Sequence, residues 1–394
     1  MNKKTVIFVF GTRPELIKIF PLILEAKKNT HLNVIACSTG QHKEMLDSLY
    51  EVFDIKPDID FQLMKPNQNL TQLHAETMMC IQKVIREHRP DWVVVQGDTT
   101  TAHASAMAAF YERVPVAHVE AGLRTYDINS PYPEEMNRRA IGLIAKAHFS
   151  PTLDAANNLK AEGVDASAVL EITGNTGIDT LKIISQKVES SESIKASMTS
   201  KFKYVNLERF VLATMHRREN FGAPQRQILN SFLHIAKTHQ IDILFPVHPN
   251  PNVRISVEQI YNSHMSCGDV VWVTPNYNFD NSQPAGRIFL VEPLHYQEMV
   301  FILQRTKLVM TDSGGLQEEA PTFAKKILVL RNSTERPEAI EAGFSELVGT
   351  DFDKITTTAA KWLNMDNNWP NGVPENPFGD GKASERIIRI LSSS

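Results

Sequence analysis

Short apolar segments of strand length recur along the first part of the chain, and each is followed by a polar turn and an amphipathic stretch. They span residues 5–10, 33–39, 92–96, 114–119 and 169–173. Runs that are apolar on both faces are typical of parallel strands covered by helices. This half therefore predicts a Rossmann-like α/β domain, with polar residues where the strands end. Open α/β sheets bind ligands at that edge.

A second series of the same kind follows, with apolar segments at residues 210–215, 241–247, 270–274, 287–291, 308–310 and 326–330. Residues 185–203 are rich in Ser, Lys and Glu and predict a solvent-facing helix and connector, near which the chain crosses between domains. Residues 276–286 form a polar insertion with Gly and Pro, which predicts a surface loop. The chain breaks again at residues 376–381 before a final amphipathic helix.

Length and composition agree with a two-domain globular protein. A chain of 394 residues is too long for one typical core, and 42% hydrophobic with 22% charged residues is ordinary globular composition. No apolar run approaches the roughly 18 residues of a membrane span, and no signal-peptide pattern opens the chain, so we expect a cytoplasmic protein without membrane contact. A net charge of −4 gives no reason to expect nucleic acid as a partner.

The most informative turn lies at residues 311–321, where a short strand leads into Ser313-Gly314-Gly315 and a helix start. Paired glycines let the backbone approach a ligand, and N–H groups at a helix start can hold a phosphate. Glu318 and Glu319 follow one turn later, where a carboxylate can accept hydrogen bonds from two ribose hydroxyls. The pattern indicates a nucleotide site. Taken alone, an ordinary turn with acids complementing the helix dipole explains it better, because short glycine motifs match by chance.

No cofactor or metal is expected from the sequence. The first strand is followed by Gly11-Thr-Arg-Pro-Glu, which lacks the second and third glycines of a dinucleotide-binding motif. The three cysteines are widely spaced, which argues against a disulfide framework and a zinc site. No cluster of Asp, His and Cys has the spacing of metal ligands.

Many spaced motifs occur together in one order. They lie at residues 10–15 with Lys18, 41–46, 97–100, 118–124, 133–138, 173–179, 216–220, 311–321, 330–338 and 376–381. On these motifs the chain resembles, almost from end to end, the non-hydrolysing UDP-N-acetylglucosamine 2-epimerases. The resemblance implies an α/β fold of two Rossmann-like domains in a GT-B arrangement, with the active site in the interdomain cleft. It implies domains at residues 1–172 and 173–377, with the helix at 378–394 packing back on the first, and a homodimer.

The resemblance implies reversible C2 epimerisation of UDP-N-acetylglucosamine to UDP-N-acetylmannosamine, which supplies a sugar nucleotide for cell-surface polysaccharide synthesis. The C2 proton is lost and UDP departs to give a 2-acetamidoglucal, and UDP then adds back while a proton arrives on the opposite face. Such a path needs carboxylates around the sugar and cationic or N–H donors around the diphosphate. Asp98, Glu120 and Glu134 match the catalytic acids of the family. Which acid acts as the base in which direction stays open.

The resemblance also implies which residues bind the diphosphate, the ribose and the sugar. An N-cap role would also explain Asp98, a turn role His216 and a surface charge Arg138. His216 is expected among the catalytic residues as well. The residues expected to bind UDP and the substrate are Arg13, Lys18, Arg138, His216, Ser313, Gly314, Gly315 and Glu319.

Some relatives bind a second UDP-N-acetylglucosamine beside the catalytic one, and matching residues are present here. They are Gln41, His42, Gln68, Arg217 and His248. Asn67 stands where some members have Arg, which removes a bidentate phosphate donor and predicts a weaker second site. Glu44 stands where some have Gln.

The chain departs from the family in three further places. Ala324-Lys325-Lys326 replaces a Gly-x-Pro, Phe378 replaces a common Tyr, and the insertion at residues 276–286 is long. These departures leave room for a modified UDP-N-acetylhexosamine as substrate. Competing functions for such a chain are a hydrolysing 2-epimerase that releases UDP and N-acetylmannosamine, a GT-B glycosyltransferase with an acceptor site, and a catalytically silent sugar-nucleotide sensor.

Overall fold

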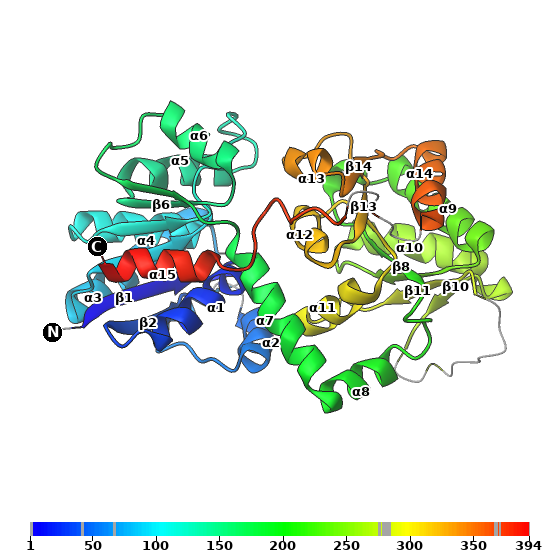
Figure 1. The fold of residues 1–394 in the computed structure, drawn as a ribbon, viewed down its shortest axis with the longest axis horizontal. Helices are drawn as coiled ribbons and strands as arrows, with labels where there is room; N and C mark the ends of the chain where they lie inside the picture. The colour runs from blue at the N-terminus through cyan, green and yellow to red at the C-terminus, as the bar shows by residue number, and fades with distance from the viewer. Residues whose placement is uncertain are drawn as a thin grey trace. The chain divides into compact units, whose positions relative to one another are not determined.

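The computed structural model describes residues 3–40, 43–65, 68–274, 277, 285–365, 369 and 372–393. The chain divides into two compact units, of which unit 1 comprises residues 1–182 and 378–394 and unit 2 residues 183–377 (Figure 1). Each contains a parallel sheet with helices, so the α/β two-domain class predicted from the sequence is confirmed. In the part of the chain that the structure describes, no helix combines the length and apolarity needed to cross a bilayer.

Unit 1 is built on a seven-stranded parallel sheet in the order β3-β2-β1-β4-β5-β6-β7. Its central strands are buried on both faces, as a parallel sheet between helical layers requires. The strands are β1 (Lys4–Phe10), β2 (Leu32–Ser38), β3 (Ile59–Asp60), β4 (Trp92–Gln96), β5 (Val116–Val119), β6 (Ala147–Ser150) and β7 (Val169–Ile172). The helices are α1 (Arg13–Lys28), α2 (Lys43–Phe53), α3 (Leu70–His88), α4 (Thr100–Tyr111), α5 (Glu134–Ile144), α6 (Leu153–Ala161), the first part of α7 (Thr176–Ser190), and α15 (Ala383–Ser393).

Unit 2 repeats the architecture with seven parallel strands in the order β10-β11-β9-β8-β12-β13-β14. The strands are β8 (Phe210–Thr214), β9 (Asp242–Pro246), β10 (Val270–Trp272), β11 (Ile288–Val291), β12 (Leu308–Thr311), β13 (Lys326–Val329) and β14 (Ser345–Leu347). The helices are α8 (Glu192–Lys201), α9 (Ala223–His239), α10 (Pro251–His264), α11 (Tyr296–Arg305), α12 (Gly314–Glu319), α13 (Pro337–Glu341) and α14 (Phe352–Asn364).

Each sheet has a central switch point from which the chain proceeds towards opposite edges, and this point fixes where a ligand can bind. In unit 1 the order turns between the neighbouring strands β1 and β4, and in unit 2 between β8 and β12. At such a switch point the connections leave in opposite directions and open a crevice at the carboxyl ends of the strands. Four of the sequence motifs, at residues 10–15, 97–100, 216–220 and 311–321, lie where these four strands end.

The boundary between the units falls inside α7, after residue 182, ten residues beyond the limit of 172 implied by the resemblance and just before the connector predicted at residues 185–203. The first turns of this helix belong to unit 1, where Thr180 donates a hydrogen bond to the carbonyl of Ile17 (2.6 Å) and Asp179 accepts one from the hydroxyl of Ser384 (2.6 Å). Because α7 continues without interruption into unit 2, no turn marks the boundary in the sequence.

The last helix, α15, returns to unit 1 after the chain has completed unit 2, and it lies beside α1 (Figure 1). Ile387 and Leu391 on its inner face are fully buried. The ammonium group of Lys4 donates to the carbonyl of Ser392 (3.1 Å), which ties the end of this helix to the first strand.

Candidate active site

Asp98 lies in the turn between β4 and α4, at the switch point of unit 1. Its carboxylate pairs with the guanidinium of Arg138 on α5 (Nη2 to Oδ2, 2.6 Å). Burial raises the pKa of Asp98 from 3.8 to about 6; the charges of Glu120 and Glu134 also raise it, whereas Arg138 and Lys18 oppose the increase. A carboxyl group with a pKa near neutrality can both take up and release a proton at working pH.

Glu120 follows β5 and takes an unusual backbone conformation, with φ of 64°. Its carboxylate accepts a hydrogen bond from Lys18 of α1 (2.5 Å) and another from the amide of Gln96 at the end of β4. A positive φ is uncommon for a residue with a side chain, and strained residues cluster at functional sites.

Glu134 is the first residue of α5 and is half-buried. Its charge contributes to the raised pKa of Asp98, so the two carboxylates lie within electrostatic reach of each other. The structure therefore brings together three carboxylates and two cations predicted from the sequence. Arg13, the first residue of α1, lies on the turn after β1, the strand beside β4.

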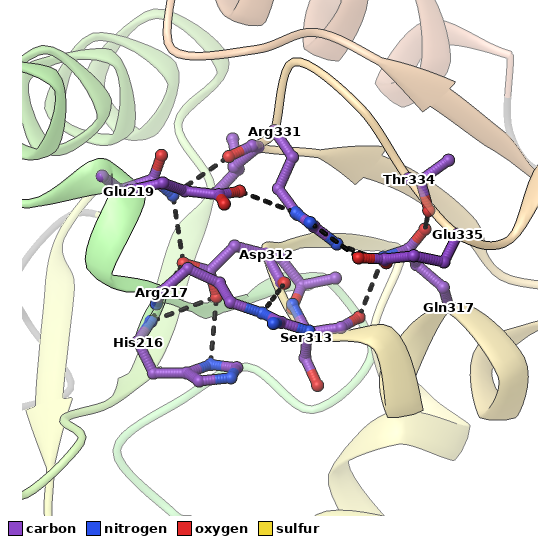
Figure 2. Close-up of polar contacts among 12 residues, drawn as sticks. His216, Arg217, Glu219, Asp312, Ser313, Gln317, Arg331, Thr334 and Glu335 are labelled. Atoms are coloured by element: carbon purple, nitrogen blue, oxygen red, sulfur yellow. Dashed lines mark hydrogen bonds and ion pairs between the residues drawn. The ribbon is translucent and has the colours of Figure 1, made fainter. Parts of the chain in front are cut away.

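In unit 2, the buried carboxylate of Asp312 organises the turn after β8 (Figure 2). It accepts hydrogen bonds from the backbone N–H groups of His216 (3.0 Å) and Arg217 (2.9 Å), from the amide of Asn220 (3.1 Å), and contacts Nδ1 of His216 (3.0 Å). Burial alone would raise the pKa of Asp312, but the His216 imidazole and these N–H groups lower it. The imidazole is held by Nδ1, which leaves Nε2 as the nitrogen that can meet a ligand.

A second cluster surrounds Arg331, next to the same turn (Figure 2). Its guanidinium bonds Glu219 through Nε (2.8 Å) and Glu335 through both terminal nitrogens (2.8 and 3.1 Å). The bond to Arg331 lowers the pKa of Glu335 to about 2. These ion pairs connect the motif after β8 to the motif after β13, so the two motifs hold each other in place.

The glycine turn after β12 opens α12, with Gly314 and Gly315 in the first turn, where backbone N–H groups have no intrahelical partner. The N–H of Ser313, by contrast, donates to the hydroxyl of Thr311 (2.9 Å). A Cβ added to Gly314 would lie 2.9 Å from Cζ of Arg336, so a larger residue there would displace the guanidinium from the helix start. Arg336 therefore places a positive charge beside the backbone N–H groups at the start of α12.

The two acids of α12 differ in their surroundings. Glu318 is buried and pairs with Arg336 (2.8 Å). Glu319, the residue expected to bind ribose, is half-buried at the end of the helix.

The residues expected at a second ligand site are spread over both units. Gln41 and His42 lie outside the described residues, and the amide of Gln68 donates to Glu76 of α3 (3.1 Å). In unit 2, the imidazole of His248 stacks on that of His216, with ring centroids 5.5 Å apart, and Arg217 donates through Nε to the carbonyl of Asp312 (3.3 Å). The structure thus places Arg217 and His248 beside the Asp312 turn.

Three residues that sequence reasoning assigned no role support these clusters. Gln96 bonds Glu120, Asp312 anchors the His216 turn, and Arg336 lies against the start of α12. Asp312 and Arg336 stand inside motifs that were recognised, so their positions carried a signal. Gln96 ends a buried apolar strand, where a polar residue with 4% exposure also signals a specific partner.

Several proteins similar to this chain in sequence carry the name UDP-N-acetylglucosamine 2-epimerase. The family model for UDP-N-acetylglucosamine 2-epimerase matches residues 24–392. The UDP-N-acetylglucosamine 2-epimerase of Campylobacter jejuni is 41% identical, with 98% of this chain and 97% of the relative covered.

Solved structures agree. The UDP-GlcNAc 2-epimerase of Neisseria meningitidis, bound to UDP-GlcNAc, superposes with a TM-score of 0.84 at 38% identity, covering 99% of this chain and 100% of that one. That of Methanocaldococcus jannaschii, in complex with UDP-GlcNAc and UDP, gives 0.77 at 31% identity, covering 99% and 100%. These matches confirm the resemblance seen in the motifs: the chain belongs to the UDP-N-acetylglucosamine 2-epimerase family.

Proposed function

We propose that this protein is an isomerase that interconverts UDP-N-acetylglucosamine and UDP-N-acetylmannosamine by elimination and re-addition of UDP. The observation that carries the proposal is the group of Asp98, Glu120 and Glu134 at the switch point of unit 1, in a member of this family. Lys18 and Arg138 balance their charge. An acid with a pKa near 6 suits proton transfer at C2 on one face, and another carboxylate of the group would transfer a proton on the opposite face.

In this proposal unit 2 binds the nucleotide. The N–H groups of Gly314 and Gly315, with Nε2 of His216 and Arg336, would surround the diphosphate, and Glu319 would accept hydrogen bonds from the ribose. Arg13 and Lys18 of unit 1 would add positive charge at the leaving UDP. Stabilising the departing diphosphate lowers the barrier to elimination, because negative charge develops there in the transition state.

One experiment separates this reaction from the competing ones. The protein is incubated with UDP-N-acetylglucosamine in deuterated water, and the products are followed by NMR. We expect UDP-N-acetylmannosamine and deuterium at C2 of both sugars. Free N-acetylmannosamine with UDP would identify a hydrolysing enzyme, and an unchanged substrate without C2 exchange would favour a glycosyltransferase or a sensor.

The catalytic assignment predicts that Asp98→Asn, Glu120→Gln and Glu134→Gln each lower turnover by at least ~10²-fold, the usual loss when a general acid or base is removed. UDP affinity should stay within about threefold by calorimetry, since these residues surround the sugar. Asp154→Asn, at an exposed position of α6, is the matched control. Near-normal turnover in all three variants would refute the assignment.

The nucleotide assignment is tested separately. Glu319→Ala and His216→Ala should each weaken UDP binding by about tenfold, because each removes a hydrogen bond to a charged or polyhydroxyl group. Unchanged affinity in both variants would remove these residues from the site.

We also propose a second, regulatory UDP-N-acetylglucosamine site that includes Gln41, His42, Gln68, Arg217 and His248. A second ligand changes the rate only if it prefers the active conformation, so the rate against substrate should be weakly sigmoidal. The reverse reaction from pure UDP-N-acetylmannosamine should show a lag that traces of UDP-N-acetylglucosamine remove and that Gln41→Ala abolishes. Full speed from the first moment would rule this site out.

A homodimer is the oligomeric state that we propose, through unit 1. Phe110 and Tyr111 at the end of α4 are more than half exposed, and with Val114 and Ile144 they line a largely apolar hollow of about 510 Å³. Exposed apolar patches of this kind mark protein interfaces. Phe110→Glu should shift sedimentation towards the monomer, whereas Ile255→Glu, at an equally exposed apolar position of α10, should not. Identical sedimentation of all three proteins would place the interface elsewhere.

The biological role proposed is cytoplasmic supply of a sugar nucleotide for a surface polysaccharide. It is supported only by the proposed reaction, whose product is an activated sugar. Loss of a surface polymer containing N-acetylmannosamine or its derivatives on deletion of the gene is the expected result, and an unchanged polymer would contradict it.

A further inference from the structure

The turn that carries Asp98 is held at each of its three residues by a different side chain. The carbonyl of Gly97 accepts a hydrogen bond from Nε2 of His118 (2.7 Å), and the carbonyl of Asp98 accepts one from the amide of Asn137 (2.8 Å). The hydroxyl of Thr99 donates to a carboxylate oxygen of Glu15 (2.5 Å). These three side chains come from β5, α5 and α1, so three separate elements converge on one turn.

All three holding side chains are removed from solvent. His118 is 0% exposed, Glu15 1% and Asn137 3%. A buried hydrogen bond cannot be replaced by water without rearrangement, so losing one leaves a carbonyl or hydroxyl unsatisfied. The donor on His118 is the N–H of a neutral ring, because burial lowers the pKa of the imidazole to about 3. The bond to Gly97 therefore does not change with pH over the working range.

The backbone conformation of Gly97 gives the turn its direction. Gly97 has a φ of 66°, and nothing lies within 4 Å of a Cβ added there, so the chain reverses by backbone conformation and not by packing. The second oxygen of Glu15 accepts the N–H groups of Gly11 (2.9 Å) and Thr12 (2.8 Å) after β1. Glu15 thus joins the two turns that flank the switch point.

The holding residues stand close in sequence to the other proposed site residues. His118 precedes Glu120 by two positions, Asn137 precedes Arg138 by one, and Glu15 lies between Arg13 and Lys18. Each of these motifs therefore contains at least one proposed site residue and one residue that bonds the Asp98 turn.

We propose that Asn137, His118 and Glu15 are positioning residues for the reaction, which orient the Asp98 carboxylate through the backbone of residues 97–99. The proposal rests on the proposed function, in which Asp98 transfers the C2 proton. None of the three is described in contact with the Asp98 carboxylate, which pairs with Arg138. A displacement of about 1 Å in a catalytic group can cost ~10² in rate, so small rearrangements of the turn should be measurable.

The decisive variant is Asn137→Ala, because it removes one hydrogen bond and no charge. We expect kcat to fall by about 10- to 100-fold with KM within about threefold, since the turn moves but the nucleotide ligands stay. Gln82→Ala is the matched control, because it removes an amide hydrogen bond to Glu112 beyond the far end of α4 (2.7 Å). Asn137→Ser, which leaves a smaller void, is measured alongside, so that an unfolded alanine variant does not end the test.

A double-mutant cycle with Asp98→Asn separates positioning from general destabilisation. If Asn137 acts through Asp98, Asn137→Ala should slow the Asp98→Asn enzyme by less than about twofold, because the group it positions is already gone. Multiplicative losses would overturn the proposal. Normal turnover of Asp98→Asn itself would instead refute the proposed role of Asp98, so the two failures are distinguishable.

His118 offers an independent check by conservative replacement. The amide of His118→Gln can still donate to the carbonyl of Gly97, whereas His118→Leu cannot. We expect the glutamine variant to keep a kcat at least about fivefold above that of the leucine variant at similar melting temperature. Equal rates in the two folded variants would remove His118 from the positioning set.

Discussion

Asp98 is held in surroundings that disfavour its working charge. Burial raises the pKa of its carboxyl group from 3.8 to about 6 in the folded chain, although Arg138 lies 2.6 Å away. The folded state therefore prefers the protonated acid. A side chain that cannot ionise should relieve this cost, at the expense of the proposed reaction.

The variant Asp98→Asn should accordingly be more stable than the native chain at high pH. The native chain loses stability as pH rises from about 4 to about 6, because in this range Asp98 ionises readily only in the unfolded chain. Above pH 6 the raised pKa of Asp98 lowers the free energy of unfolding of the native chain by its full amount, about 3 kcal/mol. Urea unfolding at pH 4, 6 and 8 measures the difference, which should grow to at most this value and vanish near pH 4. A variant less stable than the native chain at pH 8 would contradict the expectation, and Asp154→Asn controls for loss of a carboxylate.

Asp312 holds the His216 turn, which we propose to be part of the nucleotide site. Both of its oxygens accept hydrogen bonds, so Asp312→Asn must turn an amide N–H₂ towards N–H donors of His216 or Arg217. An unmade buried hydrogen bond costs about 1–3 kcal/mol, and we expect UDP affinity to fall by about tenfold in calorimetry. Asp353→Asn, at an exposed position of α14, should bind normally. Equal affinity of all three proteins would mean that the His216 turn keeps its shape without this carboxylate.

The acids of the proposed site could be proposed from the sequence because each lies in a recognised motif, in the turn after a strand or at the start of a helix. The residues that support them could not be paired with their partners from the sequence, although some of them also lie in motifs. Asp312 meets His216 across 96 positions of sequence, and His118 meets Gly97 across 21. Such pairs depend on which strands become neighbours, and strand order is not written in local periodicity.

At the scale of elements, the strands with continuous apolar runs were predicted and the short or polar ones were missed. β6 (Ala147–Ser150) contains His148 and Ser150, yet it is buried on both faces. β3 has two residues and β14 three, too few for any pattern. These segments are strands because neighbouring strands and helices enclose them, which local sequence patterns do not register. The expected loop at residues 276–286 falls mostly outside the described residues.

The departure from the family at Ala324 has a local cost. Ala324 follows a 3₁₀ turn with φ of 57°, a left-handed conformation that glycine adopts without strain. Ala324→Gly should relieve about 1 kcal/mol of strain, partly offset by the greater freedom of the unfolded chain, for a net gain of up to about 0.5 kcal/mol in urea unfolding. Ala342→Gly is the control at φ of −74°, and it should lose stability. The same sign for both variants would show that strain at Ala324 is negligible.

At the scale of the whole molecule, the repeated strand-helix pattern predicted two α/β domains, with a crossing near residues 185–203, whereas the boundary after residue 182 lies inside a continuous helix, α7. Unit 1 is completed by α15, whose buried side chains lie against α1. Burying an aliphatic side chain contributes about 1.5–3 kcal/mol, and a domain's whole stability is of the order of 5–15 kcal/mol. One helix is therefore a large part of what keeps unit 1 folded.

The variant Ile387→Asp should test this dependence. It places a carboxylate at a fully buried position and should lower the melting temperature by about 10 °C or more, with faster proteolysis of unit 1. Arg389→Asp changes an exposed position of the same helix and should melt within about 2 °C of the native chain. Similar melting of the two variants would mean that α15 adds little to unit 1.

The return of α15 also sets the order in which the protein can be completed during synthesis. Domains generally fold as they leave the ribosome, the N-terminal one first. Here residues 183–377 form a continuous unit that can close while translation continues, whereas unit 1 still lacks residues 378–394. Until the last helix emerges, the apolar face of α1 that it covers stays open to solvent. Unit 1, whose first residues are made first, is therefore completed after unit 2.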